Sequence, residues 1–192
     1  GQQYRIRETY AQAMAYALAD QLDTDLFGLS TIANVSRGVI ASTAGIKSSD
    51  LDAAFGIIES YNIPREECAF FLRPKAYYSE VLAVQKLYDA SQFGKTSLIE
   101  GTHDQVYGVP VFLTNNVLSA NASAEGGGAR NLLIHKRALA FALGNLPGGM
   151  PSGVRLQEKG SENLRVTVVG DIMYGVKKVH NSYRAVRVVG KN

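Results

Sequence analysis

Two short apolar segments, residues 104–117 and 131–143, constrain the fold of this chain most strongly. Both are rich in β-branched, aliphatic and aromatic residues and are bounded by turn residues, which at this length is typical of buried strands rather than helices. Pro110 cannot donate a hydrogen bond to a neighbouring strand, so we expect it at a sheet edge, a bulge or the start of a strand. The simplest interpretation of the two segments is the core of a mixed sheet.

A long amphipathic helix is predicted near the start of the chain, over residues 6–29. Apolar and small residues recur there at spacings of three and four, and five alanines between Ala11 and Ala19 raise the helix propensity. With a rise of about 1.5 Å per residue, such a helix would be roughly 35 Å long. We expect it to act as a spine beneath a flatter layer of strands.

Shorter elements are predicted between this helix and the first apolar segment. Residues 30–48 are rich in Ser, Thr, Gly and Ala, which predicts an irregular connection or a weak hairpin. A second helix is expected to start at a capping-box-like pair, Ser49 and Asp52. A short apolar strand follows at Cys68–Leu72, and a third helix is expected from Pro74 to about residue 88.

The rest of the chain alternates between loops and strands. We expect exposed loops at residues 91–102 and 119–130, of which the second is rich in small residues and would form a mobile tip. Four glycines and two prolines between residues 144 and 153 predict a structural boundary. Beyond it, charged and apolar residues alternate in four strands with one solvated face, at residues 154–159, 164–169, 172–179 and 183–189.

Gly94, Lys95 and Thr96 resemble the end of a P-loop, in which a glycine-rich loop surrounds a phosphate. That motif requires a glycine five residues before Gly94, where this chain has Asp89, and it requires a preceding strand where we expect a helix. A phosphate- or nucleotide-binding enzyme that uses these three residues therefore stays open only as an alternative.

No other pattern in the sequence indicates catalysis, a cofactor or a bound metal. His103, His135 and His180 lie far apart and include no pair at the spacing of helical metal ligands. Cys68 is the single cysteine, which excludes an intramolecular disulfide and a cysteine-based metal cluster. We expect it to be a small buried apolar side chain. We therefore expect no catalytic residue, cofactor or metal ligand.

Length and charge leave the class of partner open. At 192 residues, the chain can form one or two domains with a sizeable core. Its net charge of +3 is weak and it has no run of five Lys or Arg, so a small basic nucleic-acid-binding module is an alternative without a dedicated binding face. No apolar run approaches the roughly 18 residues of a membrane span, so we expect no membrane partner.

Three segments and the order of the predicted elements carry a family resemblance. The segments are Tyr107-Gly108-Val109-Pro110-Val111 with Asn115-Asn116, the run from His135 to Ala142, and Tyr174-Gly175-Val176. With an alanine-rich helix in front of them and strands after them, the chain resembles the major capsid (coat) protein of tailed double-stranded-DNA bacteriophages, which has the Hong Kong 97-like fold. The resemblance covers about residues 10–189.

The resemblance implies an α+β fold with two domains. A peripheral domain of residues 1–47 and 139–181 would hold the spine helix and long antiparallel strands. An axial α/β domain of residues 48–138 would be joined by the last strand, residues 182–190, and its loop at 119–130 would point toward the five- and six-fold axes of the shell. The N-terminal arm and the extended loop of the family have no counterpart in this sequence, so we expect a processed or partial chain.

The resemblance also implies a function and partners. We expect a structural subunit, not an enzyme, that self-assembles as pentamers and hexamers into an icosahedral virion capsid around phage double-stranded DNA, with assembly in the cytoplasm of the bacterial host. Copies of the chain would be the main partners. Scaffold, portal and decoration proteins, and packaged DNA bound without sequence specificity, would be others. An encapsulin-like protein-cage subunit of the same fold, which would enclose enzyme cargo, stays open as an alternative.

Charged side chains of mixed sign are the candidates for contacts between subunits, because opposite charges across an interface set its register. Glycine-rich junctions and a long helix that can bend would allow the same subunit to fit several quasi-equivalent positions. The candidates lie in the first helix, in the turn before Cys68, around the 119–130 loop and between the late strands: Arg5, Arg7, Glu8, Arg65, Glu66, Glu67, Glu125, Arg130, Glu158 and Lys159.

Overall fold

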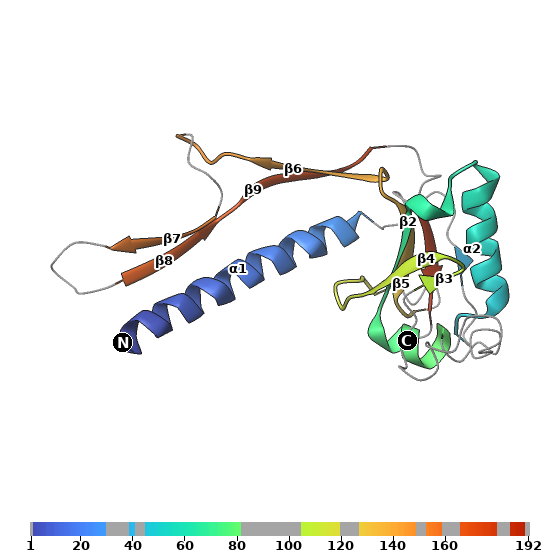
Figure 1. Cartoon of the computed structure of the whole chain (residues 1–192), viewed down its shortest axis with the longest axis horizontal. Helices are drawn as coiled ribbons and strands as arrows, with labels where there is room; N and C mark the ends of the chain where they lie inside the picture. The colour runs from blue at the N-terminus through green and yellow to red at the C-terminus, as the bar shows by residue number, and fades with distance from the viewer. Residues whose placement is uncertain are drawn as a thin grey trace. The chain divides into compact units, whose positions relative to one another are not determined.

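The computed structural model describes residues 2–29, 39–40, 45–81, 105–119, 127–148, 153–158, 166–179 and 185–190 (Figure 1). The chain divides into two compact units. Unit 1 comprises residues 1–26 and 140–177, and unit 2 comprises residues 27–139 and 178–192. Each unit therefore combines segments that are far apart in the sequence.

Unit 2 is organised around a six-stranded sheet. The β1–β10 and β2–β4 pairs are parallel, and the β10–β5, β5–β2 and β4–β3 pairs are antiparallel. The mixed sheet predicted from the two apolar segments is therefore confirmed. In spatial order the strands are β1 (Val39–Ile40), β10 (Ala185–Val189), β5 (Arg130–His135), β2 (Cys68–Leu72), β4 (Val109–Leu113) and β3 (Gln105–Val106).

Helix α2 (Ser48–Ser60) packs on one face of this sheet (Figure 1). It shares a core cluster with Phe70 and Leu72 of β2, which are buried and alternate with half-buried residues because strand side chains point to opposite faces. The rings of Phe55 and Phe70 are 6.5 Å apart in an edge-to-face arrangement. The buried residues of α2 recur at helical spacing: Leu51, Ala54, Phe55 and Ile58.

The start of α2 differs from the predicted capping pair, Ser49 and Asp52. Lys47 precedes the helix, and its backbone N–H donates a hydrogen bond to Asp50 Oδ2 at 2.9 Å. The predicted pair is wrong because the residue that precedes the helix is Lys47, two residues before Ser49, and the helix begins at Ser48. This start places Asp50 at the third helical position, where an acidic side chain can reach back to the residue before the helix.

After β2 the chain forms α3 (Pro74–Ala76) and a π-helical turn, η3 (Tyr77–Val81). Pro74 occupies the first helical position, where its missing N–H costs nothing. The predicted third helix is thus confirmed as far as Val81. Its continuation to about residue 88 lies outside the described residues.

Glu80 on η3 is buried and ties three distant parts of unit 2 together. Its Oε2 accepts a hydrogen bond from the backbone N–H of Ile46 at 2.7 Å. Gly45 and Gly190 lie so close to the carboxyl that a Cβ on either residue would be 3.1 or 2.9 Å from its atoms. Any larger residue at these two positions would therefore displace the Glu80 side chain.

Unit 1 consists of one long helix and two two-stranded sheets. The helix, α1 (Gln2–Gly28), belongs to this unit as far as Leu26. One sheet pairs β6 (Leu139–Gly144) with β9 (Met173–Lys178), and the other pairs β7 (Gly153–Glu158) with β8 (Val166–Asp171) in antiparallel register. The predicted long helix and the four strands predicted after residue 153 are confirmed. The solvated face expected for the last of these strands is wrong, because β10 lies inside the sheet of unit 2 and is buried from Val186 to Val189, Arg187 included.

Helix α1 lies along β8 and β9. A Cβ on Gly170 of β8 would be 2.6 Å from Met14 Sδ and 3.1 Å from Leu18 Cδ1, so helix and strand approach closely there. On β9, Tyr174 Oη donates a hydrogen bond to the Asp25 carboxylate. The half-buried residues of α1 that recur at spacings of three and four include Ala11, Met14, Leu18, Leu22 and Asp25.

Two further predictions about strands have different outcomes. The irregular connection or weak hairpin predicted for residues 30–48 lies mostly outside the described residues, and the described strand there, β1, pairs in parallel with β10. Strand β6 was expected to be buried, yet none of its residues is, since it pairs with β9 outside the six-stranded sheet.

Residues 27–47, which the expected division into domains groups with the first helix, belong to unit 2. The roles of the units as peripheral and axial domains stay a prediction.

Replacing Glu80 with alanine should lower the free energy of unfolding by about 1–3 kcal/mol, because the buried Ile46 N–H would lose its acceptor. Urea denaturation of the purified protein would measure the change. The matched control is Glu66→Ala, since Glu66 is exposed, and we expect it to stay within about 0.5 kcal/mol of the parent protein. Equal effects of the two substitutions would contradict a stabilising role for the Glu80 carboxyl.

Candidate subunit-contact surfaces

Glu67, a predicted contact residue, is engaged inside the chain. It ends a short 3-10 turn, η2 (Arg65–Glu67), directly before β2. Its Oε2 lies 2.7 Å from His135 Nε2, and its Oε1 lies 2.7 Å from Lys136 Nζ. These two partners, Lys136 first, lower the pKa of Glu67 from 4.5 to about 2. The carboxylate thus holds η2 against the end of β5.

His135 is buried, and both of its ring nitrogens have partners. The backbone N–H of Arg137 donates to His135 Nδ1 at 3.2 Å, so Nδ1 is the unprotonated nitrogen of the ring. Nε2 therefore carries the proton and donates to Glu67. This arrangement, with a partner at each ring nitrogen, is that of a structural histidine. Among the described residues, no group of three His, Cys, Asp or Glu could hold a metal ion.

Arg65, a second predicted contact residue, also makes its contacts within the chain. Its guanidinium lies 5.5 Å from the centre of the Phe55 ring, a cation–π distance. Nε donates to Glu59 Oε1, and this hydrogen bond raises the pKa of Arg65 and lowers that of Glu59. Nη1 reaches the backbone carbonyl of Tyr107 at 3.5 Å. The side chain therefore covers α2 and the β3–β4 turn.

Tyr107 extends this cluster to the start of β4. Its hydroxyl donates to Asp52 Oδ1 at 2.8 Å, and its ring lies 5.1 Å from that of Phe55. Burial, followed by the bond to Asp52, raises the pKa of Tyr107 to about 12. The phenol thus stays neutral and anchors the β3–β4 turn to α2.

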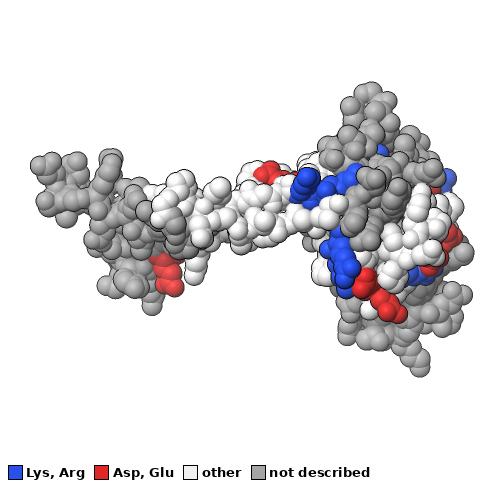
Figure 2. Space-filling model, turned by 90° about the horizontal axis from the view of Figure 1, so that it is seen from above, with Lys and Arg blue, Asp and Glu red and all other residues white. Residues whose placement is uncertain are grey.

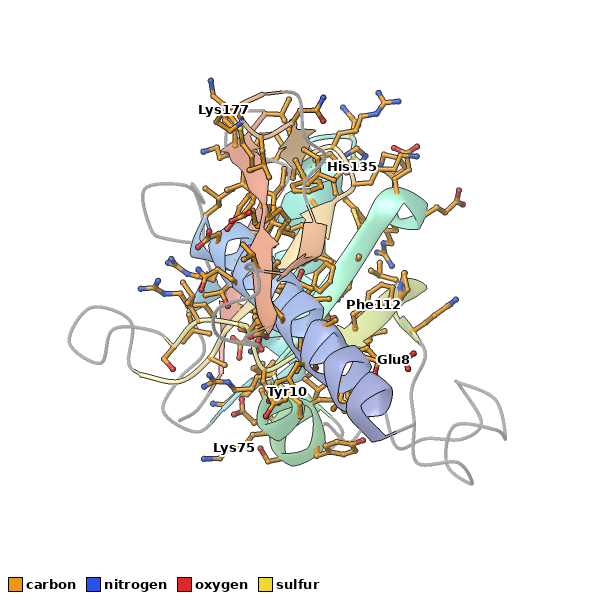
Figure 3. All side chains as sticks on the ribbon, turned by 90° about the vertical axis from the view of Figure 1, so that its left-hand side faces the viewer. Glu8, Tyr10, Lys75, Phe112, His135 and Lys177 are labelled. Atoms are coloured by element: carbon orange, nitrogen blue, oxygen red, sulfur yellow. The ribbon has the colours of Figure 1, made fainter. Side chains whose placement is uncertain are left out.

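The structure describes the other predicted contact residues to different extents. Glu8 is exposed on α1 (Figure 3), and Glu66 is exposed in η2. Arg130 is half-buried at the start of β5. The structure describes the backbone but not the side chains of Arg5 and Arg7 on α1 and of Glu158 on β7. Residues outside the described ranges are Glu125, Lys159, and the phosphate-loop candidates Gly94, Lys95 and Thr96.

A cleft of about 280 Å³ lies beside the His135 turn. This is small, because sites for drug-sized ligands have volumes of about 300–1,000 Å³. The charged groups on its wall are Glu67, which is neutralised by Lys136, and Arg137. Its lining residues are Tyr61, Asn62, Ile63, Pro64, Glu67, His135 and Arg137.

Sequence reasoning missed the exposed apolar surface of unit 1. Every residue that the structure describes as buried belongs to unit 2. In the view of Figure 2, Lys, Arg, Asp and Glu gather mainly on unit 2, and the described part of unit 1 is mostly uncharged. The large apolar side chains that unit 1 exposes are Tyr10 (labelled in Figure 3), Tyr16, Phe141, Leu143 and Met173.

A signal for this surface was present in residues 139–143, Leu-Ala-Phe-Ala-Leu. Both faces of a strand with this sequence are apolar, which is typical of a strand covered on both sides. The described part of the chain buries neither face. The apolar sequence of β6 predicts a covered strand, whereas its position outside the six-stranded sheet leaves it exposed. The two observations together indicate an apolar surface that no described residue covers.

The Glu67 cluster should make stability depend on pH in acid. The folded pKa of Glu67 lies below its ordinary value, so its contribution is fully present above about pH 4.5 and is lost as the pH falls toward about 2. Glu67→Gln should therefore lower stability at neutral pH and weaken its dependence on pH in this window, measured as urea midpoints. Glu66→Gln is the control and should behave like the parent protein. An unchanged pH dependence in Glu67→Gln would contradict the assignment.

No model of a known protein family matches the chain, and no curated protein matches it in sequence. Solved structures do match. A chain from Mycobacterium phage Che8 has a TM-score of 0.68 and 18% identity, covering 94% of this chain and 62% of that chain. A chain from the capsid structure of the Cyanophage P-SCSP1u has a TM-score of 0.66 and 18% identity, covering 95% and 65%.

The crystal structure of a virus-like particle from Pyrococcus furiosus also matches, with a TM-score of 0.52 and 13% identity, covering 90% of this chain and 62% of that chain. The present chain thus spans a little under two thirds of the length of the chains that it matches. Almost all of the present chain takes part in these matches, and the helix and strand content agrees with them. The chain has the α+β fold of the major capsid proteins of tailed bacteriophages.

Proposed function

We propose that this protein is a structural subunit of a tailed-bacteriophage capsid, in which it assembles as pentamers and hexamers into an icosahedral shell around double-stranded DNA. The observation that carries the proposal is the fold likeness over 94% of the chain to a protein of Mycobacterium phage Che8, and over 95% to a chain of a cyanophage capsid. Because one fold supports many functions, the proposal combines this likeness of fold with the physical argument for assembly that follows.

The build of unit 1 supports assembly for a physical reason. None of its residues with described burial is buried, and both of its sheets have two strands. A two-stranded sheet that buries little apolar surface is marginally stable in water, because the burial does not offset the entropy of ordering. Contacts with other chains would supply the missing burial, as they do in a shell.

A protein-cage subunit of the same fold is the second candidate, and the comparisons favour it less. The TM-score to the Pyrococcus furiosus virus-like particle is 0.52, against 0.68 and 0.66 for the two phage structures. The contents of purified particles would distinguish the two functions, since a capsid would contain DNA and a cage would contain protein cargo. A nucleotide-binding role for Gly94, Lys95 and Thr96 would require that Lys95→Ala abolish nucleotide binding.

The proposed role includes partners besides further copies. Packaged DNA would lie against the inner face without sequence specificity, and scaffold, portal and decoration proteins would act during assembly in the bacterial cytoplasm. No helix in the described residues is long and apolar enough to cross a membrane. Among the charged contact candidates, Glu8 and Glu66 are the exposed ones, whereas Arg65 and Glu67 already hold partners of their own chain.

The proposal predicts closed particles of uniform diameter from the purified full-length protein. Light scattering would give the particle mass, and electron microscopy of the same sample would give the shape. Nuclease-protected DNA in particles from infected cells would identify them as capsids. A stable monomer or dimer, even when scaffold and the complete chain are supplied, would contradict a role as a shell subunit.

A further inference from the structure

Strand β6 carries an apolar surface beside α1 that α1 does not cover. Tyr174 on the neighbouring strand β9 donates a hydrogen bond to Asp25, so the face of the β6–β9 sheet that contains Tyr174 is the one turned toward α1. The ring of Phe141 lies 6.4 Å from that of Tyr174, which places Phe141 on the same face. Leu143 follows two residues later and shares this face by strand alternation.

Both β6 side chains are nonetheless exposed. Phe141 is 44% exposed and Leu143 is 62% exposed, whereas the side of α1 that carries Met14 and Leu18 packs on β8. A single exposed leucine is ordinary on a protein surface. Here the two residues are adjacent on one face of a unit in which none of the residues with described burial is buried.

The charged residues near this surface indicate which kind of partner it can bind. Residues 139–144 contain no charged residue, and the nearby half of α1 exposes Asp20 and Asp23. DNA would require cations opposite its phosphates. Lys177 is exposed on β9 but lies three residues from Tyr174 and therefore on the other face of the sheet, whereas Lys178 shares the face of Tyr174 but is half-buried at the end of the strand. An apolar protein segment fits the surface, and a phosphate backbone does not.

We propose that Phe141 and Leu143 form an interaction surface that a second copy of this chain covers, so that the apolar core of unit 1 is completed between subunits. This inference rests on the proposed shell function, which places copies of the chain in contact. The edge of β6 away from β9 has no strand partner in its two-stranded sheet, so the same copy can approach along that edge as well.

The chain allows a direct chemical test. Cys68 is buried, and burial, followed by the nearby Glu67 charge, raises the pKa of its thiol to about 11. Thiol reagents attack the thiolate, so the native cysteine should react slowly at neutral pH. A cysteine introduced at residue 143 would therefore be the main reactive thiol. Ala142→Cys is the matched control, because Ala142 is exposed on the opposite face of the same strand.

We expect Leu143→Cys to react with a maleimide readily in dissociated subunits and at least about tenfold more slowly in assembled shells. Equal rates in subunits and shells would overturn the inference. Slow labelling in dissociated subunits of the full-length protein, with Ala142→Cys labelled fast, would also overturn it, because the cover would then come from the same chain. Absence of shells from the parent protein would instead refute the proposed function on which the inference rests.

A second pair of variants tests whether the cover contributes to assembly. Leu143→Glu would place a charge in the buried contact and should raise the subunit concentration required for shells by at least about tenfold. Ala142→Glu adds the same charge on the opposite face and should have a smaller effect. Unchanged assembly of Leu143→Glu, or equal losses in both variants, would overturn the assignment to the face beside α1.

Discussion

The fold depends on a short turn, residues 135–138, at which the chain leaves the six-stranded sheet for β6. Glu67 fixes this turn: its carboxylate is bonded to the first two residues of the turn, and its backbone carbonyl accepts the N–H of Lys136 at 3.0 Å. Ala138 closes the turn, and its carbonyl accepts the N–H of Val179 at 3.1 Å. The strand that leaves unit 2 and the strand that returns to it are therefore held together at one place.

Stability is distributed unevenly over such a fold. In unit 2, the apolar stripe of α2 shares a core cluster with buried residues of five strands, and the buried carboxyl of Glu80 joins positions that are distant in sequence. In unit 1, the helix meets its strands through half-buried residues such as Met14 and through one hydrogen bond to Asp25. Regions with few buried contacts open at lower cost than the core. We therefore expect unit 1 to open locally at a lower free-energy cost than unit 2.

The sequence predicted those elements whose periodicity is a property of their own residues. Helix α2 and strand β2 belong to this group, since their buried residues recur at periods of 3.6 and 2 regardless of their neighbours. The candidate contacts were less predictable, because pairing depends on distant segments. The β2–β5 register sets Cys68 opposite His135, and this brings Glu67 to a partner that lies 68 residues away. The exposure of Leu143 likewise follows from the sheet that β6 joins, which apolar content alone does not indicate.

The position of β10 has a consequence for synthesis on the ribosome. This strand comes last of the described strands in sequence, yet it lies between β1 and β5 inside the sheet. The sheet cannot close until residue 189 has left the ribosome, because β1 has no other described strand to pair with. Domains generally fold as units during translation, so a nascent chain of this topology would lack its complete core until late in synthesis. Until then, the strands already synthesised would keep apolar surface and unpaired edges exposed, which lengthens the stage at which nascent chains can aggregate.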